Sequence, residues 1–405
     1  MSTIIHSARL VSGGTVTPDS WVAFTGDTVA AVGTGDGWRA LAVGGVSDEL
    51  GTDTGTDTGG NLRAPNVLDA RGRWLTPGFI DIHCHGAGGA AFDDGAAGIS
   101  TALAVHREHG TTRSVLSLVT ASAAHLETRL ASIALAADND PLILGAHLEG
   151  PFLDDAFRGA HDRALLRAAD AAATERLLLA SRGYLRQITL APELPGSREA
   201  IARFVDAGVV VAVGHSAADY ESAVAAFDAG ASVLTHAFNA MHGIHHRAPG
   251  PVVAAMRSGA VTLEIINDGV HVHPEVVRLA FAGAPGRVAL ITDAMAATGF
   301  GDGEYRLGTL LVTVTNGVAR LAGATASVPG AIAGSTLTLD AALRRAVNEV
   351  GLPMATAVTA LTETPARAIG RAHDLGLLAP GFAADAVLLG DDFAVEAVFA
   401  AGQRL

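Results

Sequence analysis

The sequence predicts an α/β protein: a (β/α)8 TIM-like barrel with a small β-sandwich domain built from both chain ends. Three observations favour this fold. From Leu75 onward, short apolar runs alternate with alanine-rich amphipathic stretches, which is typical of strand–helix units around a parallel sheet. Eight such runs follow one another, and eight strands with intervening helices favour a barrel over an open sheet. The two chain ends have β character without such helices, which predicts a separate β domain.

We expect three parts along the chain. Residues 1–72 form the N-terminal part of the β-sandwich, as short strands broken by turns. Within this part, segment 48–61 is polar, repetitive and glycine-rich, with nothing to bury, and predicts a disordered insertion. Residues 73–365 form the barrel. In residues 366–405 the β character returns, so this segment forms the C-terminal part of the sandwich and could pair with the N-terminal strands.

The barrel elements follow from the apolar runs and the stretches between them. The eight predicted strands are 78–82, 114–119, 142–146, 187–190, 209–213, 232–234, 262–266 and 288–291. The predicted helices between them are 96–109, 122–136, 164–181, 197–207, 217–229 and 274–282. After the eighth strand we expect a strand-and-turn insertion near 305–322 and then a helix at 337–350.

The composition and net charge exclude several classes of function. The 405 residues carry a formal net charge of −14 that no basic stripe balances, which argues against a nucleic-acid partner. The chain contains no lysine, so all 27 basic residues are arginines, and mechanisms that need a lysine Schiff base, a lysine base or a carbamylated lysine are excluded. No apolar run reaches the ~18 residues of a membrane span, and the N-terminus lacks the pattern of a secretory signal. The single cysteine, Cys84, cannot form an internal disulfide, so we expect a cytoplasmic protein without a membrane partner.

The candidate site begins with two histidines one residue apart, His83 and His85, at the end of the first apolar run. Successive side chains of a strand point to opposite faces, so these two imidazoles share one face. Four further polar residues come at the ends of other apolar runs: Glu149, His215, His236 and Asp293. Because barrel enzymes carry their active sites at the carboxyl ends of the strands, we expect all of these side chains to meet there.

Imidazole and carboxylate groups are ligands of zinc and similar divalent metals. With Glu149 bridging, His215 and His236 could hold one metal, and a second could be held by His83, His85 and Asp293; if fewer ligands are engaged, one metal remains. Zinc is the expected metal, although iron, manganese and cobalt accept the same donor atoms. Either arrangement lowers the pKa of a bound water and polarises a carbonyl group. Asp293 is then the natural proton carrier, which indicates hydrolysis of an amide or amidine.

Four segments carry a resemblance to a known family. Residues 147–152 (His-Leu-Glu-Gly-Pro-Phe), 214–216 (Gly-His-Ser), 235–241 (Thr-His-Ala-Phe-Asn-Ala-Met) and 292–295 (Thr-Asp-Ala-Met) resemble, in order and spacing, those of the N-acetylglucosamine-6-phosphate deacetylases of the amidohydrolase superfamily. The resemblance implies that the main metal is bound by Glu149, His215 and His236, and that Asp293 is the catalytic acid and base. It also implies the reaction, which is hydrolysis of N-acetyl-D-glucosamine 6-phosphate to D-glucosamine 6-phosphate and acetate by a metal-activated water, in amino-sugar catabolism and recycling.

The same resemblance implies the substrate contacts. His161 and His271 contact the sugar, backbone groups of Asn239 and Ala240 hold its phosphate, and Arg247 reaches across a homodimer interface to the partner's site. An arginine matches a phosphate because its planar fork offers two parallel hydrogen bonds. Some members of the family replace the first histidine pair and keep one metal. Because His83 and His85 are intact here, we expect that a second metal can bind.

Other interpretations stay open at the level of the sequence. The same chemistry could act on N-acetylgalactosamine 6-phosphate, because the orientation of one hydroxyl is read by loop geometry. A ring-amidine deaminase of the same superfamily would share the histidine pair and the final aspartate, but it would lack the segment around Arg247. An inactive relative that serves as an interaction scaffold would have lost metal ligands, and none of the expected ones is missing.

Overall fold

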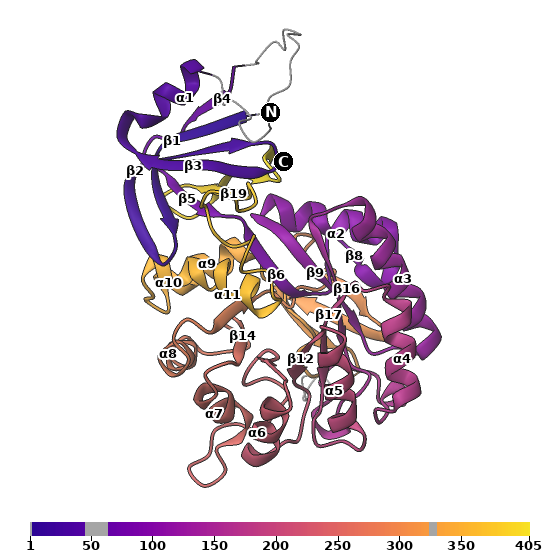
Figure 1. Cartoon of the computed structure of the whole chain (residues 1–405). Coiled ribbons are helices and arrows are strands. Elements are labelled where there is room, and N and C mark those ends of the chain that lie inside the picture. Colours follow the sequence, from indigo (N-terminus) through magenta and orange to yellow (C-terminus); the bar gives the residue numbers. More distant parts are fainter. Residues whose placement is uncertain (1, 45–63, 324–329) are drawn as a thin grey trace.

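The computed structural model describes residues 2–44, 64–323 and 330–405. Its largest part is a barrel of eight parallel strands, hydrogen-bonded in the order β15-β14-β13-β12-β11-β10-β9-β6 (Figure 1). The strands are β6 Phe79–Cys84, β9 Thr111–Val119, β10 Ile143–Glu149, β11 Leu185–Leu190, β12 Val210–Val213, β13 Val233–Leu234, β14 Thr262–Ile266 and β15 Val288–Ile291. Each predicted barrel strand overlaps one of these, and the predicted fold class is confirmed.

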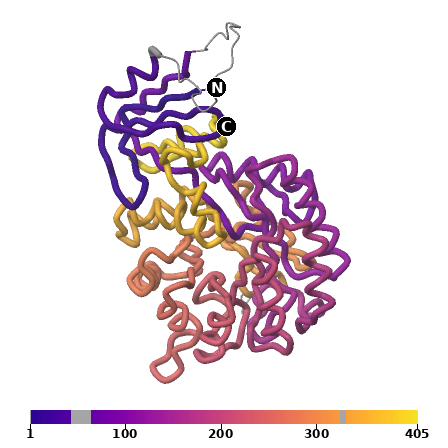
Figure 2. Tube along the Cα trace, in the orientation of Figure 1, coloured from indigo at the N-terminus to yellow at the C-terminus, as the bar shows by residue number. Residues whose placement is uncertain are grey.

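Helices follow the strands along the chain and cover the outside of the barrel (Figures 1 and 2). They are α2 Ala96–Glu108, α3 Ala123–Asn139, α4 Ala171–Ala180, α5 Ser197–Asp206, α6 Tyr220–Asp228, α7 Gly250–Arg257, α8 Pro274–Gly283, α9 Leu339–Asn348, α10 Met354–Thr359 and α11 Glu363–Ala368. Each longer helix buries one stripe, as α5 does with Ala200, Ile201 and Phe204, and this burial stabilises it against the sheet. Among the described residues, no helix is long and apolar enough to cross a membrane.

The first and last strands, β6 and β15, meet to close the barrel. The N–H of His85 donates to the carbonyl of Ala294 at 2.7 Å. From the interior of β6, the carboxylate of Asp81 accepts hydrogen bonds from the hydroxyl of Thr292 (2.6 Å) and from the N–H of His83 (3.2 Å). The closure therefore places the histidines of the first strand beside the segment that follows the last strand.

Both chain ends build a second sheet, in the order β21-β20-β19-β5-β1-β2-β3 with β4 beside β1. Its strands are β1 Ser2–Ser12, β2 Thr15–Thr25, β3 Thr28–Thr34, β4 Asn66–Asp69, β5 Trp74–Pro77, β19 Ala386–Leu389, β20 Val395–Ala400 and β21 Gln403–Arg404. Phe24 of β2 packs edge-on against Phe399 of β20, with ring centroids 6.0 Å apart, although β19, β5 and β1 separate these strands in the sheet. The sheet is thus folded over its own core, and the expected pairing of the two chain ends is confirmed.

The predicted insertion after the eighth strand is a three-stranded antiparallel sheet of β16 Gly303–Leu307, β17 Leu310–Thr315 and β18 Val318–Leu321. Its buried side chains, among them Leu307 and Val312, pack against Val119 at the carboxyl end of β9 and against Met295. The insertion therefore stands at the end of the barrel where the strands finish. A short ribbon of β7 Gly86–Ala87 and β8 Ala90–Ala91 lies at the same end, directly after β6.

Some elements differ from the prediction. Residues 2–12 form one long strand where shorter strands broken by turns were expected, and Ser7, with a positive φ of 56°, lies at an irregularity within it. A short helix, α1 Trp38–Gly44, lies where only strands were expected. The helix expected over 164–181 begins only at Ala171, since the carboxylate of Asp170 accepts from the N–H of Ala173 (2.7 Å) and caps it there.

Helix α7 was not anticipated, because its sequence opens with Gly-Pro and follows a polar loop. Proline at the first positions of a helix is compatible with helical geometry, since the N–H it lacks would have no partner there. The segment 48–61, predicted to be a disordered insertion, lies outside the described residues. The expected domain boundaries at 72 and 365 stay predictions.

Candidate active site

The structure brings the six predicted metal and proton-carrier residues together at the carboxyl ends of the barrel strands. His83 lies in β6, His85 directly follows it, and Glu149 is the last residue of β10. The other three come two residues after the ends of their strands: His215, His236 and Asp293. Their exposed fractions range from 0% at His83 to 8% at Asp293, so the cluster is almost entirely shielded from solvent.

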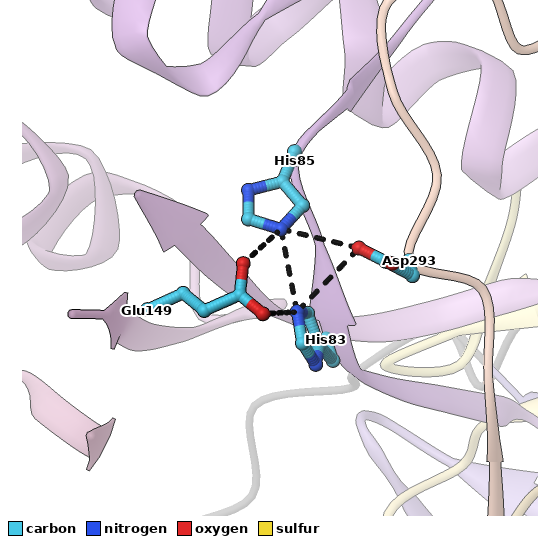
Figure 3. A group of neighbouring side chains, drawn as sticks. All are labelled: His83, His85, Glu149 and Asp293. Atoms are coloured by element: carbon cyan, nitrogen blue, oxygen red, sulfur yellow. Dashed lines mark hydrogen bonds and ion pairs between the residues drawn. The ribbon is translucent and has the colours of Figure 1, made fainter. Parts of the chain in front are cut away.

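One half of the cluster consists of His83, His85, Glu149 and Asp293 (Figure 3). Nε2 of His85 lies 3.2 Å from one oxygen of Glu149 and 3.2 Å from Oδ1 of Asp293. Nε2 of His83 lies 3.5 Å from the other oxygen of Glu149 and 3.6 Å from Oδ1 of Asp293. Two imidazole nitrogens and two carboxylates therefore point toward a common centre.

The other half shares Glu149. Its Oε1 lies 3.0 Å from Nε2 of His215 and 3.0 Å from Nε2 of His236, and these two nitrogens are 2.9 Å apart. His161 approaches from the side, with Nε2 at 3.4 Å from Oε2 of Glu149 and Nδ1 at 2.9 Å from the hydroxyl of Thr120. Glu149 thus stands between two groups of histidines, as expected for a bridging ligand.

The donor set fits divalent cations. Nδ1 of His215 donates to the carbonyl of Phe157 (2.9 Å), so in the neutral imidazole Nε2 carries a lone pair. That lone pair faces the carboxylate oxygen Oε1 of Glu149 at 3.0 Å. Acceptors repel one another at such distances unless a positive charge lies between them. Nitrogen and oxygen donors in this number are those of catalytic zinc and related metal sites.

A cavity of about 330 Å³ opens above the cluster. His161, Asn239, Ala240 and His271 line it, so four of the five predicted substrate residues lie at one place. The fifth, Arg247, lies apart on an exposed loop, where its guanidinium is 2.6 Å from Nε2 of His246. A single chain therefore does not bring Arg247 to its own cavity.

The comparisons with known proteins agree with this arrangement. The model of the amidohydrolase family matches residues 74–405. The chain belongs to the amidohydrolase family. The family resemblance predicted from the four sequence segments is confirmed.

Several relatives of this amidohydrolase are named sugar-phosphate deacetylases. An N-acetylgalactosamine-6-phosphate deacetylase of Escherichia coli O157:H7 is 38% identical over 297 residues, covering 72% of this chain and 77% of the relative. An N-acetylglucosamine-6-phosphate deacetylase of Vibrio furnissii is 36% identical over 336 residues, 82% of each chain. The crystal structure of N-acetyl-D-glucosamine-6-phosphate deacetylase from Mycobacterium smegmatis matches with a TM-score of 0.87 and 40% identity over all of both chains.

The electrostatics of the amidohydrolase site favour positive charge. Burial alone would raise the pKa of Glu149, but the charge of His83 and the hydrogen bonds with the neighbouring histidines together hold that pKa well below its usual range. Burial opposes a charged His85, yet its contacts with Asp293 and Glu149 raise its pKa to about 9. The carboxylates thus stay ionised and attract cations, for which protons and a divalent metal compete. Burial lowers the pKa of His161 to about 4, so this imidazole is neutral at pH 7.

The backbone turns sharply where the ligands leave their strands. His215, His236 and Asp293 all have positive φ, at 47°, 26° and 49°. Residues other than glycine rarely adopt this conformation, which costs about 1–3 kcal/mol and concentrates at functional sites. Ala240 in the predicted phosphate segment shares it, with φ of 49°. There the N–H of Asn239 donates to the carbonyl of His236 (3.0 Å), which ties this segment to a metal ligand.

Other residues of the amidohydrolase site were not found from the sequence. Leu307 of β16 lines the cavity, and so does Ile332, which pairs with Arg320 of β18; the alternating apolar residues of the insertion were the only signal. Glu193 accepts from the hydroxyl of Ser216 (2.7 Å) and the N–H of Ala217 (2.6 Å), and so holds the loop that carries His215. No pattern in the sequence distinguishes this carboxylate from an ordinary loop residue.

Proposed function

We propose that the chain hydrolyses N-acetyl-D-glucosamine 6-phosphate to D-glucosamine 6-phosphate and acetate. The observation that carries the proposal is the buried carboxylate of Asp293, which faces the cavity 3.2 Å from Nε2 of His85 within a set of metal-ligand side chains. The relatives named above are sugar-phosphate deacetylases, which favours this reaction over deamination of a ring amidine.

The proposed metal ligands are the clustered side chains. Glu149, His215 and His236 would hold one cation, and the second would be held by His83, His85 and Asp293, with Glu149 between them. A divalent cation bound there lowers the pKa of a water molecule and polarises the carbonyl of the acetyl group. We propose zinc as the cation; iron, manganese and cobalt accept the same donors.

Asp293 is the proposed proton carrier. Burial opposes its ionisation, but the hydrogen bond from His85 and the charge of His83 lower its pKa, so at neutral pH it is a carboxylate able to accept a proton. As the oxygen of water attacks the acetyl carbon, its proton passes to Asp293. When the C–N bond breaks, the same proton passes to the nitrogen, which leaves as the amine of the sugar while acetate remains. His161, held by Thr120, and His271, held by Asp268 (2.7 Å), would orient the sugar.

The phosphate must be bound by local groups, because the chain carries a net charge of −14. We propose that backbone groups of Asn239 and Ala240 contact it and that Arg247 of a second copy completes the contact in a homodimer. The exposed position of Arg247, away from the cavity of its own chain, supports this assignment. We also propose a cytoplasmic location, since Cys84 has no cysteine partner in the chain and the substrate is a phosphorylated metabolite.

N-Acetylgalactosamine 6-phosphate is the second candidate substrate, because the relative from Escherichia coli O157:H7 at 38% identity carries that name. The two sugars differ only in the orientation of one hydroxyl group. Acetate release from zinc-reconstituted protein is the test, with both epimers and unphosphorylated N-acetylglucosamine compared. Fast acetate release from N-acetylglucosamine 6-phosphate alone supports the proposal. Faster release from its epimer would make N-acetylgalactosamine 6-phosphate the substrate instead. With metal shown to be bound, no release from any of the three would overturn the deacetylase function.

A further inference from the structure

A buried glutamate behind the metal ligands has no role in the chemistry described so far. Glu264 lies in the middle of β14, and its side chain is completely buried. Ile266, two residues on, lines the active-site cavity, and residues two apart in a strand share a face. Glu264 therefore points into the barrel, directly beneath the site.

Two strands and the turn after a third contribute donors to this carboxylate. Oε2 lies 3.0 Å from Nδ1 of His83 and accepts from the N–H of His236 at 3.3 Å. Oε1 accepts from the side-chain amide of Gln187 at 2.7 Å. Among the described residues, no arginine pairs with Glu264, unlike the buried Asp385, which Arg113 binds with two nitrogens at 2.6 and 3.1 Å. No arginine supplies positive charge to this buried carboxylate, so that charge must come from the site itself, either from a protonated His83 or from a cation held there.

The contact with His83 has a chemical consequence. Each oxygen of Glu264 already accepts from an N–H group, Oε1 from Gln187 and Oε2 from His236, so Nδ1 of His83 approaches an acceptor and carries the proton. In the neutral imidazole the lone pair then sits on Nε2, which points at Glu149, His85 and Asp293 at 3.3–3.6 Å. The opposite tautomer would present an N–H to the cation and could not ligate it.

We propose that Glu264 is a positioning residue that fixes the tautomer of His83 and the main chain at His236, and so couples the two halves of the metal site. One oxygen atom contacts both residues, each of which belongs to a different half. The inference rests on the proposed metal-dependent function. It extends that function by naming the group that sets the tautomer of His83 in one half and holds the main chain of His236 in the other.

The test compares Glu264→Gln with Asp385→Asn in the zinc-loaded full chain. Both variants turn a buried carboxylate into an amide, but only Glu264 touches metal ligands. Zinc retained per chain is measured after challenge with a graded series of chelator concentrations. We expect Glu264→Gln to hold zinc about 10- to 100-fold more weakly, while Asp385→Asn holds it as the wild type does.

Equal zinc retention by Glu264→Gln and the wild type would overturn the proposal, and so would an equal loss in Asp385→Asn, which would indicate a general effect of destabilisation. If Glu264→Gln does not fold, the wild-type chain decides. In the zinc-loaded wild type, the ring proton of His83 should be on Nδ1 and should exchange slowly. Nitrogen-15 NMR locates this proton, and the spectrum of His83→Gln assigns the signal. A proton on Nε2 refutes the inference. Zinc binding and acetate release by the wild type test the proposed function separately.

Discussion

The main-chain N–H of Asp293 donates to the carbonyl of His83 at 2.9 Å, across the line where the first and last barrel strands meet. This bond joins the proposed proton carrier to a proposed metal ligand through the backbone alone. A change in the Asp293 side chain should therefore alter chemistry without displacing His83.

Asp293→Asn should reduce kcat by about 10²- to 10⁴-fold, because an amide cannot take a proton from water and return it to the amine. The amide keeps the size of the carboxylate, and its oxygen can still face His85. The cation proposed at Glu149, His215 and His236 should be retained, so elemental analysis should find at least one metal per chain. A variant that holds its metal and turns over at a near-normal rate would refute the role of Asp293.

Gly159 should be required for the position of His215. Its φ is +54°, and a Cβ added there would lie 3.2 Å from Cε1 of the His215 ring. Gly159→Ala should therefore lower kcat/KM in the deacetylase assay by pressing on a metal ligand. Gly208→Ala is the matched control, since Gly208 also has a positive φ, of +74°, but a Cβ there would meet no atom within 4 Å.

Both alanine variants should lose about 1–2 kcal/mol of folding stability from the left-handed backbone, as measured by denaturant unfolding. Only Gly159→Ala should lose activity at a temperature where both are folded. Equal activity in the two variants would show that the contact with His215 has no effect on turnover.

The sequence was sufficient for the barrel and for the cluster at its strand ends, because both follow from local patterns. His83 and Glu149 end apolar runs, and parallel strands bring such ends together. Glu264 was not found, because a glutamate within Thr262–Ile266 interrupts an apolar run in the same way whether it faces solvent or the barrel interior. Leu307 and Ile332 were missed for a related reason: only the folded insertion brings them to the cavity.

The ion pair of Arg113 and Asp385 should be a strong link between the barrel and the C-terminal segment. Both side chains are 8% exposed, and Arg113 also donates to the carbonyl of Pro141 at 2.7 Å. Removing one partner leaves a buried charge unpaired, which costs about 3–5 kcal/mol. Arg113→Met and Asp385→Asn should each lose stability of this order in denaturant unfolding. The double variant should lose clearly less than the sum; simple additivity would show that the pair is not coupled.

A contact between helices α2 and α9 should stabilise the fold by an amount that depends on pH. His109, at the end of α2, contacts Asp340 in the first turn of α9, with Nδ1 at 3.1 Å from Oδ1. The hydrogen bond to Asp340 raises the pKa of His109. Burial opposes a charged Asp340, but the hydrogen bonds from His109 and from the hydroxyl of Thr338, together with the charge of His109, lower the pKa of this carboxyl.

The two shifts act at opposite ends of the pH range. A raised histidine pKa adds stability that is complete below the ordinary value of about 6.5 and disappears as pH rises through the raised value. A lowered aspartate pKa adds stability that is complete above about 3.9 and disappears as pH falls through the lowered value. The pair should therefore stabilise the fold most between about pH 4 and 6.5.

The wild type and His109→Gln should differ by about 0.5–1 kcal/mol at pH 5.5, a modest amount because His109 is partly exposed and solvent screens its charge. At pH 9 the difference should be smaller, since the charge of His109 is lost as pH rises through its raised pKa. In an Asp340→Asn background, His109→Gln should have the same effect at both pH values, because the charge that raises the histidine pKa has been removed. The test is the unfolding free energy of each protein at the two pH values. If the wild type and His109→Gln differ by the same amount at both, His109 and Asp340 are held by packing rather than by charge.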